Sequence, residues 1–149
     1  MMTVAVGARA ETPKYFFKLE EINSGQQFTM DELDADLPLI VFVWAADCPH
    51  CQRHMPYAVA LYKKLDLERV NFVSIAMDED KKETQDYIAE KELEFPVLNA
   101  WDGTFGAGFS AEGWPTTFVF ATGGKFLGIC DTTGPSYITE VLEMVGQAK

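Results

Sequence analysis

The strongest constraint on the fold is an apolar run that leads directly into a pair of cysteines. Leu39–Trp44 is continuously apolar and of strand length, which is typical of a strand buried on both faces. Cys48 and Cys51 follow it, separated by Pro49 and His50, where a segment with helical spacing begins. Two of the three cysteines and both histidines lie between positions 48 and 54. A Cys-x-x-Cys pair between a strand and a helix indicates a thiol–disulfide redox site.

Length and composition indicate a single globular domain. The chain has 149 residues, of which 48% are hydrophobic and 23% charged, and a chain of this size buries roughly 70% of its surface without disulfide staples. We expect a flexible terminus over residues 1–12 and one monomeric domain over residues 13–149. The net charge of −11 argues against nucleic acid or an anionic membrane as a partner, because both require clustered Lys and Arg.

Targeting signals are not evident in the sequence. No stretch approaches the roughly 18 consecutive apolar residues of a membrane helix. Met1–Ala10 lacks the charged start and apolar run of a complete secretory signal. We therefore expect no membrane span in this chain, whereas a signal or anchor removed from the native protein stays an open alternative.

Apolar periodicity and turn residues predict strands that alternate with helices, hence an α/β fold. A strand, a helix and a strand in succession require a right-handed crossover, so the runs at 39–44 and 70–76 should be parallel neighbours. We expect a central mixed sheet flanked by helices, with an added hairpin at the N-terminus. The expected strands are Tyr15–Glu20, Gln26–Phe28, Leu39–Trp44, Val70–Ala76, Phe95–Leu98, Thr116–Ala121 and Phe126–Cys130, and the expected helices are Thr29–Leu37, Cys48–Leu65, Lys81–Lys91 and Pro135–Gly146.

The position of each cysteine predicts its role. Cys48 should lie at the helix N-terminus, where unpaired amides and the helix dipole stabilise a thiolate, so we assign it as the nucleophile. Cys51, one turn further along, should be less exposed and resolve a mixed disulfide. His50 can stabilise the thiolate further, whereas the carboxylate of Asp47 disfavours it. Cys130 should be a semi-buried thiol at a strand end, without an assigned function.

Three alternatives apply to this cluster. A zinc or copper site could use Cys48, Cys51, His50 or His54, although a closed zinc site needs ligands that the rest of the chain hardly supplies. A redox sensor would form the same disulfide without catalysing exchange. His50 could be no more than a solvated histidine at a helix end, and His54 could either contact the site or face solvent.

Pro115 is the second candidate for the site. It follows Trp114 at the entry to an expected strand. A proline there could form a cis turn beside the cysteines, which would leave the Trp114 backbone free to pair with an extended substrate. An ordinary proline at a strand entry would look the same in the sequence.

Nearly the whole chain, from about Tyr15 to Val145, resembles the TlpA/ResA group of thioredoxin-like proteins. The matching motifs are Trp44–Ala45 before the cysteines, Met55–Pro56 after them, Phe95–Val97, Pro115–Phe118 and Gly124–Lys125. The resemblance implies a thioredoxin fold and an extracytoplasmic thiol–disulfide oxidoreductase that exchanges disulfides with partner proteins and an upstream redox donor or acceptor. It places Pro115 at the cis-proline position, with Trp114 and Pro49 also contacting substrate. The Cys48–Cys51 disulfide would be the only redox group, with no further cofactor.

Three positions depart from that group. Asp47 stands where a Trp is usual, Phe42 where thioredoxins bury an Asp or this group places Asn, and His54 where many reductive members carry a Glu. His54 could transfer a proton to Cys51, because histidine titrates near neutral pH. The Cys-Pro-His-Cys tetrapeptide resembles DsbA-type oxidases instead. Scaffold and tetrapeptide therefore point to opposite directions of electron flow.

Overall fold

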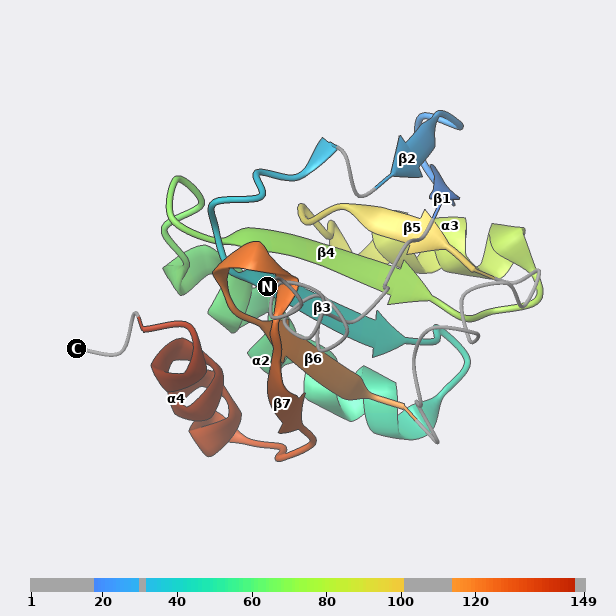
Figure 1. Ribbon diagram of the computed structural model, residues 1–149. Coiled ribbons are helices and arrows are strands. Elements are labelled where there is room, and N and C mark those ends of the chain that lie inside the picture. Colours follow the sequence, from blue (N-terminus) through green and yellow to red (C-terminus); the bar gives the residue numbers. More distant parts are fainter. Residues whose placement is uncertain (1–17, 30–31, 101–113, 147–149) are drawn as a thin grey trace.

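The protein is described by a computed structural model that covers residues 18–29, 32–100 and 114–146. Within these ranges a mixed sheet of seven strands runs in the order β2-β1-β5-β4-β3-β6-β7, from top to bottom in Figure 1. The strands are β1 Lys18–Glu21, β2 Gln27–Thr29, β3 Leu39–Trp44, β4 Asn71–Ala76, β5 Val97–Asn99, β6 Thr116–Phe120 and β7 Phe126–Cys130. The helices are α2 Pro49–Lys64, α3 Lys81–Lys91 and α4 Pro135–Met144, and a 3-10 turn, Thr122–Gly124, joins β6 to β7.

Strand β3 lies at the centre of the sheet, as its apolar run predicted. It pairs in parallel with β4, through Trp44 and Ala76 at their carboxyl ends, and antiparallel with β6. Strand β5 extends the parallel part beyond β4. The antiparallel pairs β1–β2 and β6–β7 confirm both predicted hairpins. This mixed α/β sheet places the carboxyl ends of β3 and β4 side by side, and Cys48 follows the first of them.

The two faces of β3 enter different hydrophobic clusters, because successive side chains of a strand point to opposite faces. Ile40, Phe42 and Trp44 pack with buried residues of α2, α3 and α4. Leu39, Val41 and Val43 pack on the opposite face with residues of β4 and β6. All six side chains are buried. Helix α2, which carries Cys51, is thus held against a strand whose six side chains are all buried.

The predicted helix over Thr29–Leu37 is wrong. Thr29 ends β2, residues 30–31 lie outside the described ranges, Glu32 is in a 3-10 turn, and residues 33–37 contain bends and turns without a helix. One half of the predicted capping box is present, because the Thr29 N–H donates to Glu32 Oε2 at 3.1 Å. Asp34 then accepts the Asp36 N–H at 2.9 Å through its side chain and the Asn71 Nδ2–H at 2.8 Å through its carbonyl. Such bonds between side chain and backbone compete with helix formation.

A buried hydrogen bond joins α4 to β6. The Tyr137 hydroxyl lies 2.8 Å from Thr117 Oγ1, and both side chains are buried. We expect Tyr137→Phe to lower the free energy of unfolding by about 1–2 kcal/mol, because the Thr117 hydroxyl loses its partner in a dry environment. Urea denaturation measures the change, and Tyr57→Phe, at a partly exposed tyrosine of α2, is the control. Equal stability of both variants would contradict the expectation.

Candidate redox site

Cys48 occupies the N-cap position of helix α2. Its backbone is extended, α2 begins at Pro49, and the Cys48 sulfur accepts the Cys51 N–H at 3.2 Å. Proline suits the first helical position because the missing N–H would have no partner there. The sulfur therefore lies at the positive end of the helix dipole and accepts an amide that has no partner within the helix. The predicted location of Cys48 is confirmed.

The two cysteines differ in exposure, as predicted. Cys48 is partly exposed and Cys51 is fully buried. Burial is the main cause that raises the pKa of the Cys51 thiol far above its ordinary value, and its hydrogen bond with Cys48 raises it further. Cys51 is therefore held as a protonated thiol behind Cys48. All three cysteines are free in this structure, and Cys130 is buried at the end of β7.

Trp114 and Pro115 lie beside the nucleophile. The peptide bond between them is cis, and the Cys48 thiol donates to the Trp114 carbonyl oxygen at 3.7 Å. Trp114 is 39% exposed, so its backbone carbonyl contacts the sulfur at a residue that solvent reaches. The structure therefore brings together Cys48 and two of the three residues that the sequence suggested for substrate contact, Trp114 and Pro115. Pro49 is also exposed at this end of α2.

His50 is turned toward Arg53 on the next turn of α2. Arg53 Nη2 lies 2.7 Å from His50 Nδ1. A guanidinium only donates hydrogen bonds, so Nδ1 is the acceptor and the imidazole proton belongs on Nε2. His50 is exposed, and among the described contacts none joins its ring to the Cys48 sulfur. The tuning role predicted for His50 thus has no direct hydrogen bond to carry it in this structure.

His54 faces the core, which excludes the solvent-facing alternative. Its side chain is 3% exposed, and its ring centroid lies 4.3 Å from that of Tyr137 and 5.8 Å from that of Phe42. Its buried Nδ1 atom has no hydrogen-bond partner. Burial lowers the pKa of His54 from 6.5 to about 4, so the ring is neutral at neutral pH. Proton transfer from His54 to Cys51 stays a prediction.

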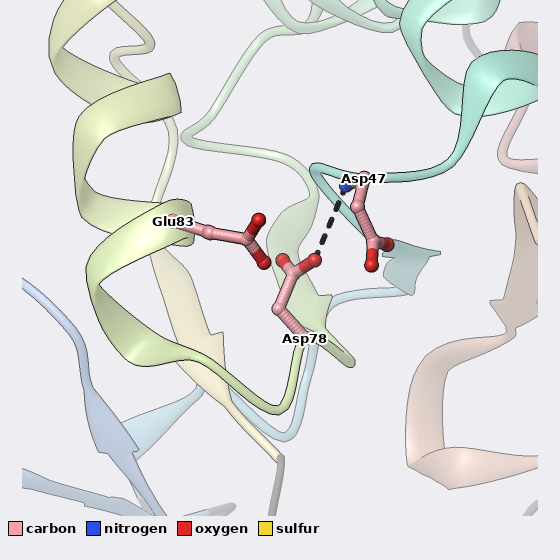
Figure 2. A group of neighbouring side chains, drawn as sticks. All are labelled: Asp47, Asp78 and Glu83. Atoms are coloured by element: carbon pink, nitrogen blue, oxygen red, sulfur yellow. Dashed lines mark hydrogen bonds between the residues drawn. The ribbon is translucent and has the colours of Figure 1, made fainter.

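Sequence reasoning missed Asp78, a buried carboxylate at the carboxyl end of β4. Both of its oxygens accept the Ala46 N–H, at 2.8 and 2.9 Å, and Thr84 Oγ1 donates to it at 2.7 Å. Figure 2 shows Asp78 between Glu83 and Asp47, whose backbone N–H also donates to it, at 3.3 Å. One signal could have found it. The carboxyl ends of neighbouring parallel strands meet at one edge of the sheet, so an acidic residue just after β4 is expected near the loop that leads from β3 to Cys48.

The alternative metal site is not assembled. Among the described residues, the group of metal-ligating side chains with atoms within 4.8 Å of one another is Asp47, Asp78 and Glu83, and it contains neither cysteine nor histidine. His54 points into the aromatic core, and His50 pairs with Arg53. Acidic side chains gather at protein surfaces without binding a cation, so we assign no metal to this group.

Comparison with known proteins places the chain in a family. The sequence model of the AhpC/TSA family matches residues 9–126. The chain belongs to the AhpC/TSA family. It is 26% identical over 84 residues to the thiol-disulfide oxidoreductase ResA of Bacillus thuringiensis subsp. konkukian. The aligned region covers 56% of this chain and 49% of that protein. The chain thus spans about half the length of the curated relatives that it matches first.

Solved structures of thiol:disulfide interchange proteins share the fold. A thiol:disulfide interchange protein of the thioredoxin family from Chlorobium tepidum is 25% identical, with a TM-score of 0.75 over 93% of this chain and 96% of its own. A putative thiol:disulfide interchange protein DsbE from the same organism reaches a TM-score of 0.79 at 19% identity, over 93% and 96% of the two chains. The predicted thioredoxin fold and the resemblance to the TlpA/ResA group are confirmed.

Proposed function

We propose that this AhpC/TSA family member is a thiol–disulfide oxidoreductase that exchanges disulfides with partner proteins through Cys48 and Cys51. The observation that carries the proposal is the asymmetry of the pair: the Cys48 sulfur caps α2 and reaches the surface beside Trp114, while Cys51 is buried directly behind it. A nucleophile that is accessible and a resolving thiol that is protected are what two-step disulfide exchange requires. ResA relatives and the Chlorobium structure carry matching names.

In the first step the Cys48 thiolate attacks one sulfur of a partner disulfide. The partner S–S bond breaks, its other sulfur leaves as a thiolate, and Cys48 is joined to the partner. In the second step Cys51 loses its proton and attacks the Cys48 sulfur, which releases the partner as a dithiol and leaves a Cys48–Cys51 disulfide. Two electrons pass to the partner, and the two protons released by the cysteines end on its thiols. The reverse sequence oxidises a partner dithiol.

The surface around Cys48 suits an extended partner segment. The Trp114 carbonyl accepts the Cys48 thiol, Pro49 follows Cys48 in the chain, and both residues are exposed. Pro115 follows Trp114 through a cis peptide bond. We propose that the Trp114 backbone pairs with the partner and that the His50 imidazole adjusts the Cys48 thiolate as a nearby hydrogen-bond donor. The cysteine pair itself carries the electrons, without a further cofactor.

We propose an extracytoplasmic location and an upstream redox donor or acceptor, which rest on the resemblance to the TlpA/ResA group. In residues 18–29, 32–100 and 114–146, no helix combines the length and the apolar character that crossing a bilayer demands. The redox sensor remains the second candidate, because it would use the same pair. Turnover separates the two functions.

The purified protein should catalyse the reduction of insulin by dithiothreitol, monitored by turbidity, and should cycle between dithiol and disulfide in a glutathione buffer. Cys130→Ser is the control for a buried thiol outside the pair, because Cys130 pairs with Thr117 across β6 and β7 and its thiol donates to Glu140 Oε1 at 3.7 Å instead of to Cys48 or Cys51. This variant should keep at least about half of the wild-type rate, since a site of exchange needs only the Cys-x-x-Cys pair. A reversible disulfide without turnover would contradict an exchange enzyme and favour the sensor.

A further inference from the structure

The loop between β3 and the nucleophile, Ala45–Asp47, is held by one side chain from β4. Asp78 is 3% exposed and accepts the Ala46 N–H with both oxygens and the Asp47 N–H with one. The chain stays paired with the end of β3 just beyond β4, where the Met77 N–H donates to the Trp44 carbonyl at 2.9 Å. The carboxylate therefore closes the gap between the ends of the two strands.

The same loop contacts the redox pair from its other side. The Ala45 carbonyl accepts the Cys48 N–H at 3.3 Å, and the Ala45 backbone lies near enough to the Cys51 thiol to lower its pKa, against the larger effect of burial. The Ala46 carbonyl accepts Gln52 Nε2–H at 2.9 Å on the first turn of α2. A shift of the loop would thus move both cysteines relative to each other and to the helix N-terminus.

Asp78 also brings negative charge to the pair. Every hydrogen-bond partner of Asp78 is a donor, namely the Ala46 N–H, the Asp47 N–H and the Thr84 hydroxyl. An ionised carboxylate, which only accepts hydrogen bonds, satisfies all three donors. Asp47 and Glu83 lie within 4.8 Å of it, and neither ion pair of the described residues involves this cluster. The pKa of the Cys51 thiol is raised mainly by burial and by Cys48, and the charge of Asp78 raises it a little further. Negative charge beside a thiol opposes its ionisation.

We propose that Asp78 is a positioning residue of the redox pair, which holds the Ala45–Asp47 loop against β4 and makes the dithiol less stable relative to the disulfide. This inference rests on the proposed function, since it concerns the same cysteines. It implies that this end of β4, together with the Cys-Pro-His-Cys tetrapeptide, sets the reducing strength of the protein. A less stable dithiol gives up its electrons more readily.

Equilibration with glutathione tests the role of Asp78. The Cys48–Cys51 disulfide accepts two electrons and two protons from two glutathione molecules, which become joined as glutathione disulfide. We expect Asp78→Asn to shift this equilibrium toward the protein dithiol by about tenfold or more, which corresponds to about 30 mV in reduction potential. Asparagine has nearly the same shape but loses the charge, and its NH₂ group opposes the backbone donors of the loop. An equilibrium constant within about twofold of wild type would overturn the proposal.

Two variants serve as controls for charge and for the start of α3. Glu83→Gln removes a charge from the same cluster but keeps the bonds of Asp78 to the loop, so its shift should be clearly smaller. Asp80→Asn removes the exposed N-cap carboxylate of α3 and should leave the constant within about twofold of wild type. A shift with Glu83→Gln as large as that with Asp78→Asn would assign the effect to charge alone and overturn the positioning role.

A measurement on the wild-type protein covers the case in which Asp78→Asn does not fold. Amide hydrogen exchange of Ala46 and Asp47 should be about a hundredfold or more slower than in an unstructured peptide, because a buried carboxylate holds both N–H groups. Unprotected exchange at both amides would overturn the proposal. A wild-type protein that forms no reversible disulfide contradicts the proposed function instead, so the two failures are distinguishable.

Discussion

Cys48→Ser should abolish disulfide exchange, with a loss on the order of a thousandfold or more in the insulin assay, because no other described thiol is accessible at the site. The variant isolates chemistry from structure. Serine is a favoured N-cap residue, so its Oγ can accept the Cys51 N–H as the Cys48 sulfur does. The fold and the start of α2 should therefore survive, as thermal unfolding would verify.

Cys51→Ser should fail at a different step. Cys48 still attacks a partner disulfide, but without the resolving thiol the mixed disulfide persists. We expect a covalent complex with a protein substrate on a non-reducing gel, released by dithiothreitol, together with a nearly complete loss of multiple turnover. Because Cys51 is fully buried, a serine hydroxyl there costs stability, on the order of 1–3 kcal/mol. Cys51→Ala repeats the test without adding a polar group.

The two variants together decide the order of the cysteines. A complex trapped by Cys48→Ser and not by Cys51→Ser would reverse the assignment of nucleophile and resolving thiol. Retained turnover in both variants would remove the pair from the mechanism. The trapped complex also bears on the direction of electron flow, because the partner in it can be identified and its native redox state determined.

The sheet could be predicted because its signals are local. Leu39–Trp44 is apolar at every position, and burial of all six side chains makes β3 the central strand. The turn Thr122–Gly124 between two mainly apolar runs likewise predicts the β6–β7 hairpin. The helix expected over Thr29–Leu37 failed because Asp34 and Asp36 bond within turns instead. The capping pattern of Thr29 and Glu32 does not reveal that side chains further along will form these competing hydrogen bonds.

The site was predictable only as far as its residues are neighbours in sequence. Cys48, Cys51 and the helix N-terminus follow from spacing along one segment. Asp78 reaches the loop from 32 residues away, so its role depends on the register of β3 and β4. Whether His54 faced the site or solvent was equally undetermined, because the deciding contacts come from Phe42 on β3 and Tyr137 on α4. The positions of Asp78 and His54 are set by packing between distant parts of the chain, which leaves no pattern in the local sequence.

His54 should make the protein sensitive to acid. Its pKa is lowered from 6.5 to about 4 by burial, so between these values the unfolded chain binds a proton that the folded chain excludes. The surrounding rings of Phe42, Tyr57 and Tyr137 are uncharged and offer the imidazolium no partner. The stability associated with a neutral His54 is therefore complete above about pH 6.5 and is lost as the pH falls toward 4.

Urea denaturation of wild type and His54→Phe at pH 7 and pH 4.5 measures this contribution. Phenylalanine fits the aromatic surroundings and cannot bind a proton, so the wild type should lose about 2 kcal/mol more than the variant between these pH values. His50→Gln, at the other histidine of the chain, is the control and should follow the wild type. Parallel curves for wild type and His54→Phe would contradict the assignment of the acid-sensitive group.

The same His54→Phe variant decides whether the buried imidazole also serves the redox chemistry. A group that passes a proton to or from Cys51 should slow disulfide exchange when it is removed and should change the dependence of the rate on pH. A variant that gains acid stability but keeps the wild-type rate profile would restrict His54 to packing among Phe42, Tyr57 and Tyr137. Proton exchange at Cys51 would then have to be carried by another group or by solvent.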